Sequence, residues 1–96
     1  MGTSSKRFEV NLIKYEVEFK QSAIKSLGKL PKKIQRRIQG VIAVLETNPL
    51  PPSAVKMKGR DAYRIRVSDY RIIYSVENNK LLIIVVAIGH RREVYR

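Results

Sequence analysis

Three arginines interrupt a stretch whose other side chains are typical of a β-sheet. The stretch AYRIRVSDYRIIYSV runs from Ala62 to Val76, and its arginines are Arg64, Arg66 and Arg71. A guanidinium stays charged and presents a planar set of donors that matches phosphate oxygens. If the three side chains come together, the chemistry they predict is the binding of a phosphate.

The spacing does bring them together. With Ser68-Asp69 as a two-residue hairpin turn, Arg66 lies opposite Arg71 and Arg64 lies opposite Ile73. Because side chains alternate between the two faces of a strand, the arginines then share one face and the apolar side chains occupy the other. Like charges at opposed positions repel, so we expect an anion to compensate. The alternative is that the arginines are only solvated.

Polar residues near the carboxyl end extend this cluster. Gly89 breaks the last apolar run and is expected to bring His90, Arg91 and Tyr95 to the same basic end. Histidine is the side chain that most often titrates near neutral pH, so His90 is a candidate acid or base.

Hydrophobic periodicity shows which elements must position the cluster. Alternating apolar residues predict a first strand that begins near Lys14. Apolar residues spaced by three and four predict a short helix from Ser22 to Leu30, and a longer amphipathic helix of about four turns follows Pro31. The longer helix has basic side chains on its polar side, which we expect to be solvated, with attraction of a partner as the alternative: Lys32, Lys33, Arg36 and Arg37.

The second half of the chain reads as a meander of three strands. The prolines of Asn48–Pro52 end the helix, and three strand-like runs follow, at Ala62–Val67, Tyr70–Glu77 and Lys80–Ile88. The order β-α-α-β-β-β predicts an α+β fold, with two helices packed on one face of an antiparallel sheet.

The second turn decides what else shares the arginine face. If Asn78-Asn79 is also a two-residue turn, Arg71 lies opposite Val86. Four apolar side chains then join the arginine face, namely Leu82, Ile84, Val86 and Ile88. Large apolar patches are seldom left open, so we expect a cover, either from the segment around Phe8 and Val10 or from a second protein.

Composition indicates a single folded domain with an anionic partner. The chain has 96 residues and a formal net charge of +12, with 20 lysines and arginines against 8 aspartates and glutamates. Nucleic acid is the leading candidate for a partner that such a charge attracts, and an anionic membrane surface or an acidic protein comes next. Residues 1–13 are expected to be a tail or an extra edge segment, and residues 14–96 the domain.

Several classes of protein are excluded or disfavoured. The chain has no cysteine, which excludes disulfides and thiolate metal sites and favours a cytoplasmic setting. Its longest apolar run, Leu81–Ile88, is far shorter than the roughly 20 residues of a membrane helix, so no membrane association is expected. We also expect no metal, because the sequence has neither a histidine pair nor clustered carboxylates.

The carboxyl-terminal half resembles the RelE/ParE superfamily of bacterial and archaeal toxins, and within it the RelE branch. Together with the first strand and the helical pair, the resemblance covers about Lys14 to Arg96. The motifs that carry it are Lys58-Gly59, Tyr63–Val67, Asp69–Tyr74, Ile88–Arg91 and Val94-Tyr95.

The resemblance implies the toxin of a type II toxin–antitoxin system. It implies a ribosome-dependent, metal-independent endoribonuclease without cofactors, which enters the ribosomal A site among the rRNA, cuts mRNA there and so inhibits translation. A cognate acidic antitoxin would hold it inactive. The family's functional positions match here at Arg64, Arg66, Arg71, Arg91 and Tyr95, and we expect Lys58, Arg60 and Arg92 to contact RNA.

The implied roles are divided among these side chains. We assign Arg64, Arg66 and Arg71 to the scissile phosphate and Arg91 to the leaving group, whereas Tyr95 stacks on a base or orients the 2′-hydroxyl. At the first two positions the best-known RelE branch has lysine. A guanidinium does not readily give up its proton, so the general base is left open, with His90 as a candidate outside the family's pattern.

Two functions from other classes are consistent with the same residues. A ParE-like inhibitor of DNA gyrase would share the fold without nuclease activity. A non-catalytic nucleic-acid-binding module would bind RNA in a salt-dependent manner and would tolerate loss of Tyr95.

Overall fold

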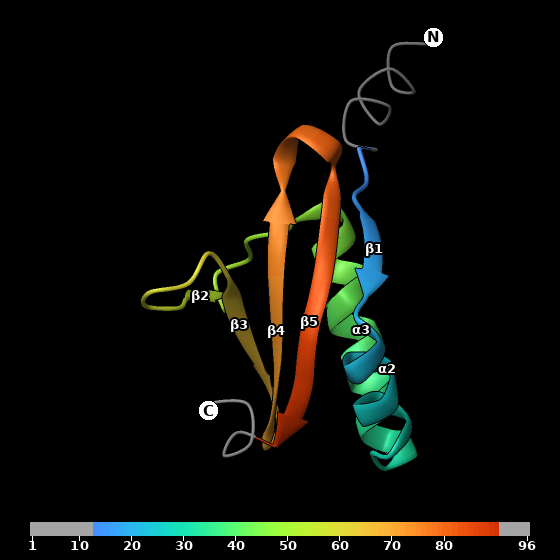
Figure 1. Ribbon diagram of the computed structural model, residues 1–96. Coiled ribbons are helices and arrows are strands. Elements are labelled where there is room, and N and C mark those ends of the chain that lie inside the picture. The colour runs from blue at the N-terminus through green and yellow to red at the C-terminus, as the bar shows by residue number, and fades with distance from the viewer. Residues whose placement is uncertain (1–12, 91–96) are drawn as a thin grey trace, which may run out of the picture.

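The computed structural model describes residues 13–90, which form two helices and a five-stranded sheet (Figure 1). The expected α+β fold with two helices on one face of the sheet is confirmed. The elements are β1 (Glu16–Phe19), α2 (Gln21–Gly28), α3 (Lys32–Thr47), β2 (Val55–Lys56), β3 (Tyr63–Val67), β4 (Tyr70–Glu77) and β5 (Leu82–His90), with a 3₁₀ turn at Asn78–Lys80.

The strand order in the sheet is β1-β5-β4-β3-β2. Neighbouring strands from β2 to β5 are antiparallel, but β1 pairs in parallel with β5, with Glu16 beside Leu82. The expectation of a purely antiparallel sheet was therefore wrong at this edge. The short strand β2 was also missed, because it lies in a segment that reads as a proline-rich loop.

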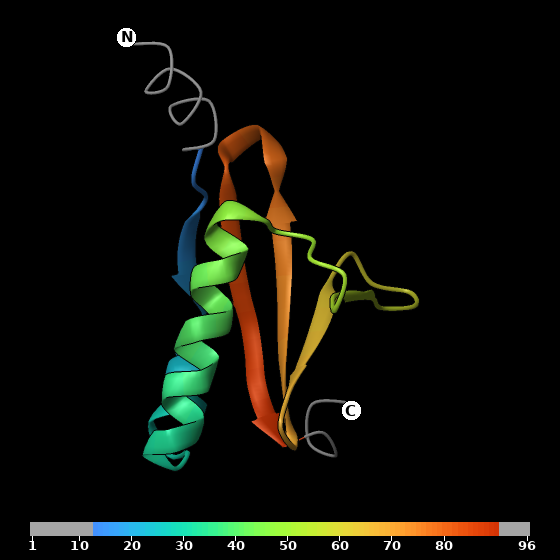
Figure 2. The same cartoon turned by 180° about the vertical axis from the view of Figure 1, so that it is seen from behind.

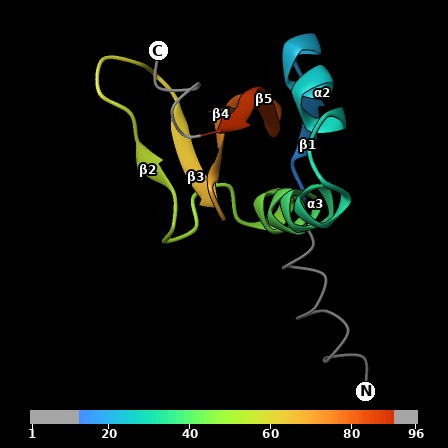
Figure 3. The same ribbon diagram turned by 90° about the horizontal axis from the view of Figure 1, so that it is seen from below.

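Helix α3 follows the predicted apolar stripe. Pro31 precedes its first turn, where a missing amide hydrogen costs nothing, and Ile38, Ile42 and Leu45 are buried. These side chains pack with Ala23 of α2 against the sheet. Both helices lie on the same side of the sheet, and Figures 2 and 3 show this arrangement from behind and from below.

The core lies between this helix layer and one face of β3, β4 and β5, which we call the helix face of the sheet. Its fully buried strand residues include Ile72, Tyr74, Ile83 and Val85. The opposite side carries the three arginines, and we call it the arginine face. The arginines therefore lie on the side of the sheet opposite the core between the helices and the strands.

The hairpin between β3 and β4 has the predicted register. Val67 pairs with Tyr70, Arg66 with Arg71, and Arg64 with Ile73. Ser68 adopts a left-handed conformation with φ 57°, as a tight two-residue connection between twisted strands requires. The turn thus fixes the face on which each arginine lies.

The register predicted between β4 and β5 was wrong, for two reasons. The turn is longer than expected: it takes a 3₁₀ conformation and ends at Leu81 with φ 50°, so Glu77 pairs with Leu82. A bulge then lies farther along the strands, where Tyr74 pairs with Val85 but Ile73 pairs with Ala87. Val86 is the extra residue.

The bulge changes the side of the sheet on which the end of β5 presents its residues. Inserting one residue turns every later side chain to the other face. Leu82 and Ile84 lie on the arginine face as expected, whereas Ile88 pairs with Ile72 and joins the core. Gly89, not Val86, lies opposite Arg71.

Among residues 13–90, no helix is long and apolar enough to cross a membrane.

Candidate functional site

The arginine face brings together three of the predicted site residues. Arg64 and Arg66 come from β3 and Arg71 from β4, and Arg66 and Arg71 are direct cross-strand partners. Their exposure differs: Arg66 is exposed, Arg64 is half-buried, and Arg71 is only 8% exposed. The three guanidinium groups therefore sit at graded depths on one surface.

Arg71 occupies the inner position of this cluster. Its strand lies between β3 and β5, with Arg66 on one side and Gly89 on the other. Glycine has no side chain, so its position opposite Arg71 contributes none to this face. A partly buried guanidinium next to a second one favours an anion more strongly than an exposed one, because less water screens the charges. The arrangement suits a phosphate that reaches down to Arg71.

His90 does not lie with the arginines. It pairs with Tyr70, on the helix face, and the two rings meet edge to face with centroids 5.8 Å apart. Around them, Ser26 of α2 and Lys29, which follows the helix, line a hollow of about 470 Å³. The bulge in β5 is the cause, because without it His90 would lie on the arginine face.

The two loop cations expected to contact RNA lie away from the cluster centre. Lys58 and Arg60 are exposed in the hairpin between β2 and β3. Gly59 has φ +71° and permits the turn, and an amide of Met57 donates to the carbonyl of Ala62 at 2.9 Å. This hairpin joins the Tyr63 end of β3, whereas Arg66 lies near the other end (Figure 1).

The remaining predicted positions, Arg91, Arg92 and Tyr95, lie outside the described residues, as does the segment of Phe8 and Val10. Their roles stay predictions. Within residues 13–90 there is also no group of histidine and acidic side chains that could hold a metal ion.

A groove that sequence reasoning did not anticipate connects the cluster to helix α3. It has a volume of about 500 Å³ and runs between the helix and the end of β3. Four residues of α3 line it, and three of them, Gly40, Val41 and Val44, follow Arg37 by three, four and seven positions. All four therefore lie on one face of the helix. The lining residues are Arg37, Gly40, Val41 and Val44 of α3 with Arg66, Val67 and Ser68.

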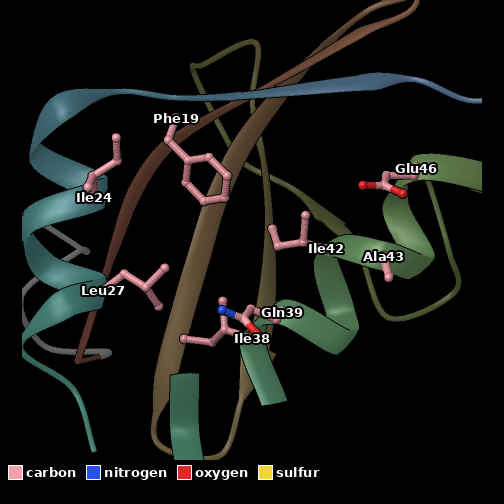
Figure 4. Close-up of a pocket in the computed structure, with 8 residues that line it drawn as sticks. All are labelled: Phe19, Ile24, Leu27, Ile38, Gln39, Ile42, Ala43 and Glu46. Carbon is pink, nitrogen blue, oxygen red and sulfur yellow. The ribbon is translucent and has the colours of Figure 1, made fainter. Parts of the chain in front are cut away.

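A second, apolar groove lies between the two helices and β1, with a volume of about 430 Å³. Figure 4 shows the side chains of Phe19 and Leu27 pointing toward the space between α2 and α3. Ile24, an apolar residue of α2, borders this groove and is 55% exposed. The helix layer therefore leaves apolar surface open to a partner.

Tyr74 links the sheet to the proline-rich loop. Its hydroxyl donates a hydrogen bond of 2.7 Å to the carbonyl of Pro49, and its ring lies 5.9 Å from that of Tyr63. Burial, and then the neighbouring Tyr63, raise the pKa of Tyr74 to about 12. This tyrosine is a structural donor that stays protonated.

Comparisons with known proteins agree with this architecture. The family model described as the ParE toxin of the type II toxin–antitoxin system parDE matches residues 17–95. A small α+β toxin is therefore the class that the fold and the basic face define. The chain belongs to the RelE/ParE superfamily and is a RelE-like toxin of a type II toxin–antitoxin system.

Particular relatives support the RelE branch. A RelE-like toxin protein of Escherichia coli is 39% identical over 82 residues, which is 82% of this chain and 85% of the relative. The mRNA interferase toxin RelE of Escherichia coli K12 is 31% identical over 87 residues, covering 84% of this chain and 90% of the relative. The toxin in the archaeal RelE–RelB complex from Pyrococcus horikoshii superposes with a TM-score of 0.71 at 32% identity, covering 81% and 96% of the two chains.

Proposed function

We propose that this toxin is a ribosome-dependent endoribonuclease that cleaves mRNA in the ribosomal A site. The observation that carries the proposal is the opposition of Arg66 and Arg71 on a face that the core does not use. The 31% identity to an mRNA interferase toxin supports the same activity.

The proposed chemistry assigns charge stabilisation to the arginine face. Cleavage by the 2′-hydroxyl adds negative charge to the phosphorane, and preorganised guanidinium donors stabilise that charge more than the ground state. Arg71 holds the phosphate from below, and Arg64 and Arg66 contact it from β3. Arg91 and Tyr95 keep their predicted roles at the leaving group and the base. His90 is removed from this face by the bulge, so we assign it no proton transfer.

A translation-coupled cleavage assay with the purified chain tests the proposal. Arg66→Ala changes an exposed residue and should lower the cleavage rate by about 10²-fold, as expected for loss of one transition-state donor. Arg71→Ala should lower it at least as much, and expression of either variant should no longer arrest growth. Arg36→Ala removes the same charge from an exposed position of α3 outside the arginine face and should cleave as the parent does.

The results also separate the alternatives. Unchanged cleavage in both Arg66→Ala and Arg71→Ala would refute the site assignment. Inhibition of purified DNA gyrase with no mRNA cleavage would instead establish the ParE-like activity, and salt-dependent RNA binding without either activity would establish a binding module.

We further propose that the partner in the cell is an acidic antitoxin. The net charge of +12 and the open apolar groove between α2 and α3 favour a partner with acidic and apolar side chains. Such a protein, encoded beside this one, should co-purify with it and abolish cleavage; failure to do both would count against it.

A further inference from the structure

We propose that the groove of Arg37 and Arg66 is a second site for the RNA phosphodiester backbone, next to the scissile phosphate. The inference rests on the proposed function and extends it, because it adds to the arginine face a residue that none of the resemblances assigns. It predicts that RNA continues from Arg71 around the edge of β3 and onto helix α3.

Arg37 and Arg66 bring positive charge to the groove without a counter-ion among the described residues. Arg37 and Arg66 come from different elements and line the same groove. Within residues 13–90, neither side chain makes an ion pair or a hydrogen bond, and no acidic side chain lines the groove. Two guanidinium groups held near one hollow with no carboxylate favour an anion, and a phosphodiester offers oxygens to both.

The open shape of the groove also suits an extended chain of phosphates. Between the two arginines the walls are low, because Gly40 has no side chain and Ser68 has a small one. A Cβ added at Gly40 would meet nothing within 4 Å, so the groove is open at that point. A backbone of linked phosphates needs such an open channel, whereas a compact metabolite would need an enclosed pocket.

The groove is continuous with the arginine face. Arg66 belongs to both surfaces, since it is the cross-strand partner of Arg71 and also a wall of the groove. Strand β2 covers the edge of β3 only at Tyr63 and Arg64, so among the described residues no strand pairs with the outer edge of β3 beyond Arg64. In the described part of the sheet, only β3, which carries Arg66, therefore lies between Arg71 and this outer edge.

The test measures binding of a short fluorescent oligouridylate to the full chain over a range of salt concentrations, without ribosomes. Arg37→Ala should weaken binding about five- to tenfold and lower the slope of log K against log salt by about 0.7, the value for one phosphate contact on a single strand. Arg36→Ala is the matched control. It removes the same charge from the neighbouring position, which does not line the groove, and should leave the slope near that of the parent.

Gly40→Leu provides a variant that keeps the net charge. It should fill the groove and weaken RNA binding several-fold, with an unchanged far-UV circular dichroism spectrum. Equal effects of Arg37→Ala and Arg36→Ala would overturn the inference, because diffuse attraction would then explain the binding. Normal binding by folded Gly40→Leu would overturn it as well. If Gly40→Leu does not fold, the comparison of Arg37→Ala with Arg36→Ala decides the question alone.

The outcome is independent of the proposed nuclease activity. If the parent chain cleaves mRNA but Arg37→Ala binds RNA normally, only the groove assignment fails. If no cleavage occurs while Arg37→Ala loses RNA affinity and Arg36→Ala does not, the groove stands and the nuclease proposal fails.

Discussion

Replacing Tyr74 by phenylalanine should make the protein less stable at neutral pH but less sensitive to alkali. At neutral pH the variant loses the 2.7 Å hydrogen bond to the Pro49 carbonyl, which should cost about 1 kcal/mol of unfolding free energy. Tyr74 is 0% exposed, so no solvent replaces the lost donor directly.

The alkaline effect follows from the pKa of the same hydroxyl. Tyr74 titrates at about 12 in the folded protein, against 10.0 for an ordinary tyrosine. Above pH 10 the unfolded chain releases this proton first, so stability is fully present below pH 10 and falls as the pH rises toward 12. At pH 11, one unit above the ordinary value, the loss amounts to about 1.4 kcal/mol.

Urea unfolding at pH 9 and pH 11 measures this difference. The parent should lose about 1.4 kcal/mol more between the two pH values than Tyr74→Phe does, since all other groups titrate alike in both proteins. Tyr15→Phe, which removes an exposed hydrogen bond to Asn78, serves as the control and should behave as the parent does. Parallel pH profiles for the parent and Tyr74→Phe would refute the reasoning.

Two further predictions concern the core and helix α3. Ile88→Ala should destabilise the protein by about 2 to 5 kcal/mol, as for a buried isoleucine, and Ile84→Ala by clearly less; similar losses in urea unfolding would contradict the bulge in β5. Gly40→Ala should raise the thermal midpoint, with a gain of about 0.5 to 1 kcal/mol in the unfolding free energy, because alanine restricts the unfolded chain and has room in the folded one. A lower midpoint would show that the helix needs glycine there.

The first hairpin could be predicted from sequence because its register depends on local chemistry. Ser68 and Asp69 are good residues for a two-residue turn, and alternation on both sides leaves one pairing that buries the apolar side chains. The positions of Arg64, Arg66 and Arg71 followed from that single turn. The apolar stripe of α3 was equally local, since it depends only on helical periodicity.

The second hairpin could not be predicted in this way. Nearly all residues of β5 before Gly89 are apolar, so a shift by one position still places apolar side chains on both faces. The pattern therefore contains no signal for the bulge at Val86, which is set by packing of Ile88 against the helices. Arg37 was assigned to solvent for a related reason: its partner in the groove, Arg66, is distant in sequence, and only the packing of α3 beside β3 brings them together.

The parallel pairing of β1 with β5 has a consequence for how the chain is made. Glu16 pairs with Leu82, so this contact joins the beginning of the described chain to the last described strand. Strand β5 also lies inside the sheet, between β1 and β4. Contacts between distant residues form late and slowly, and during synthesis these cannot form until the final strand has left the ribosome. The sheet that carries the arginine face is therefore complete only after β5 has emerged from the ribosome.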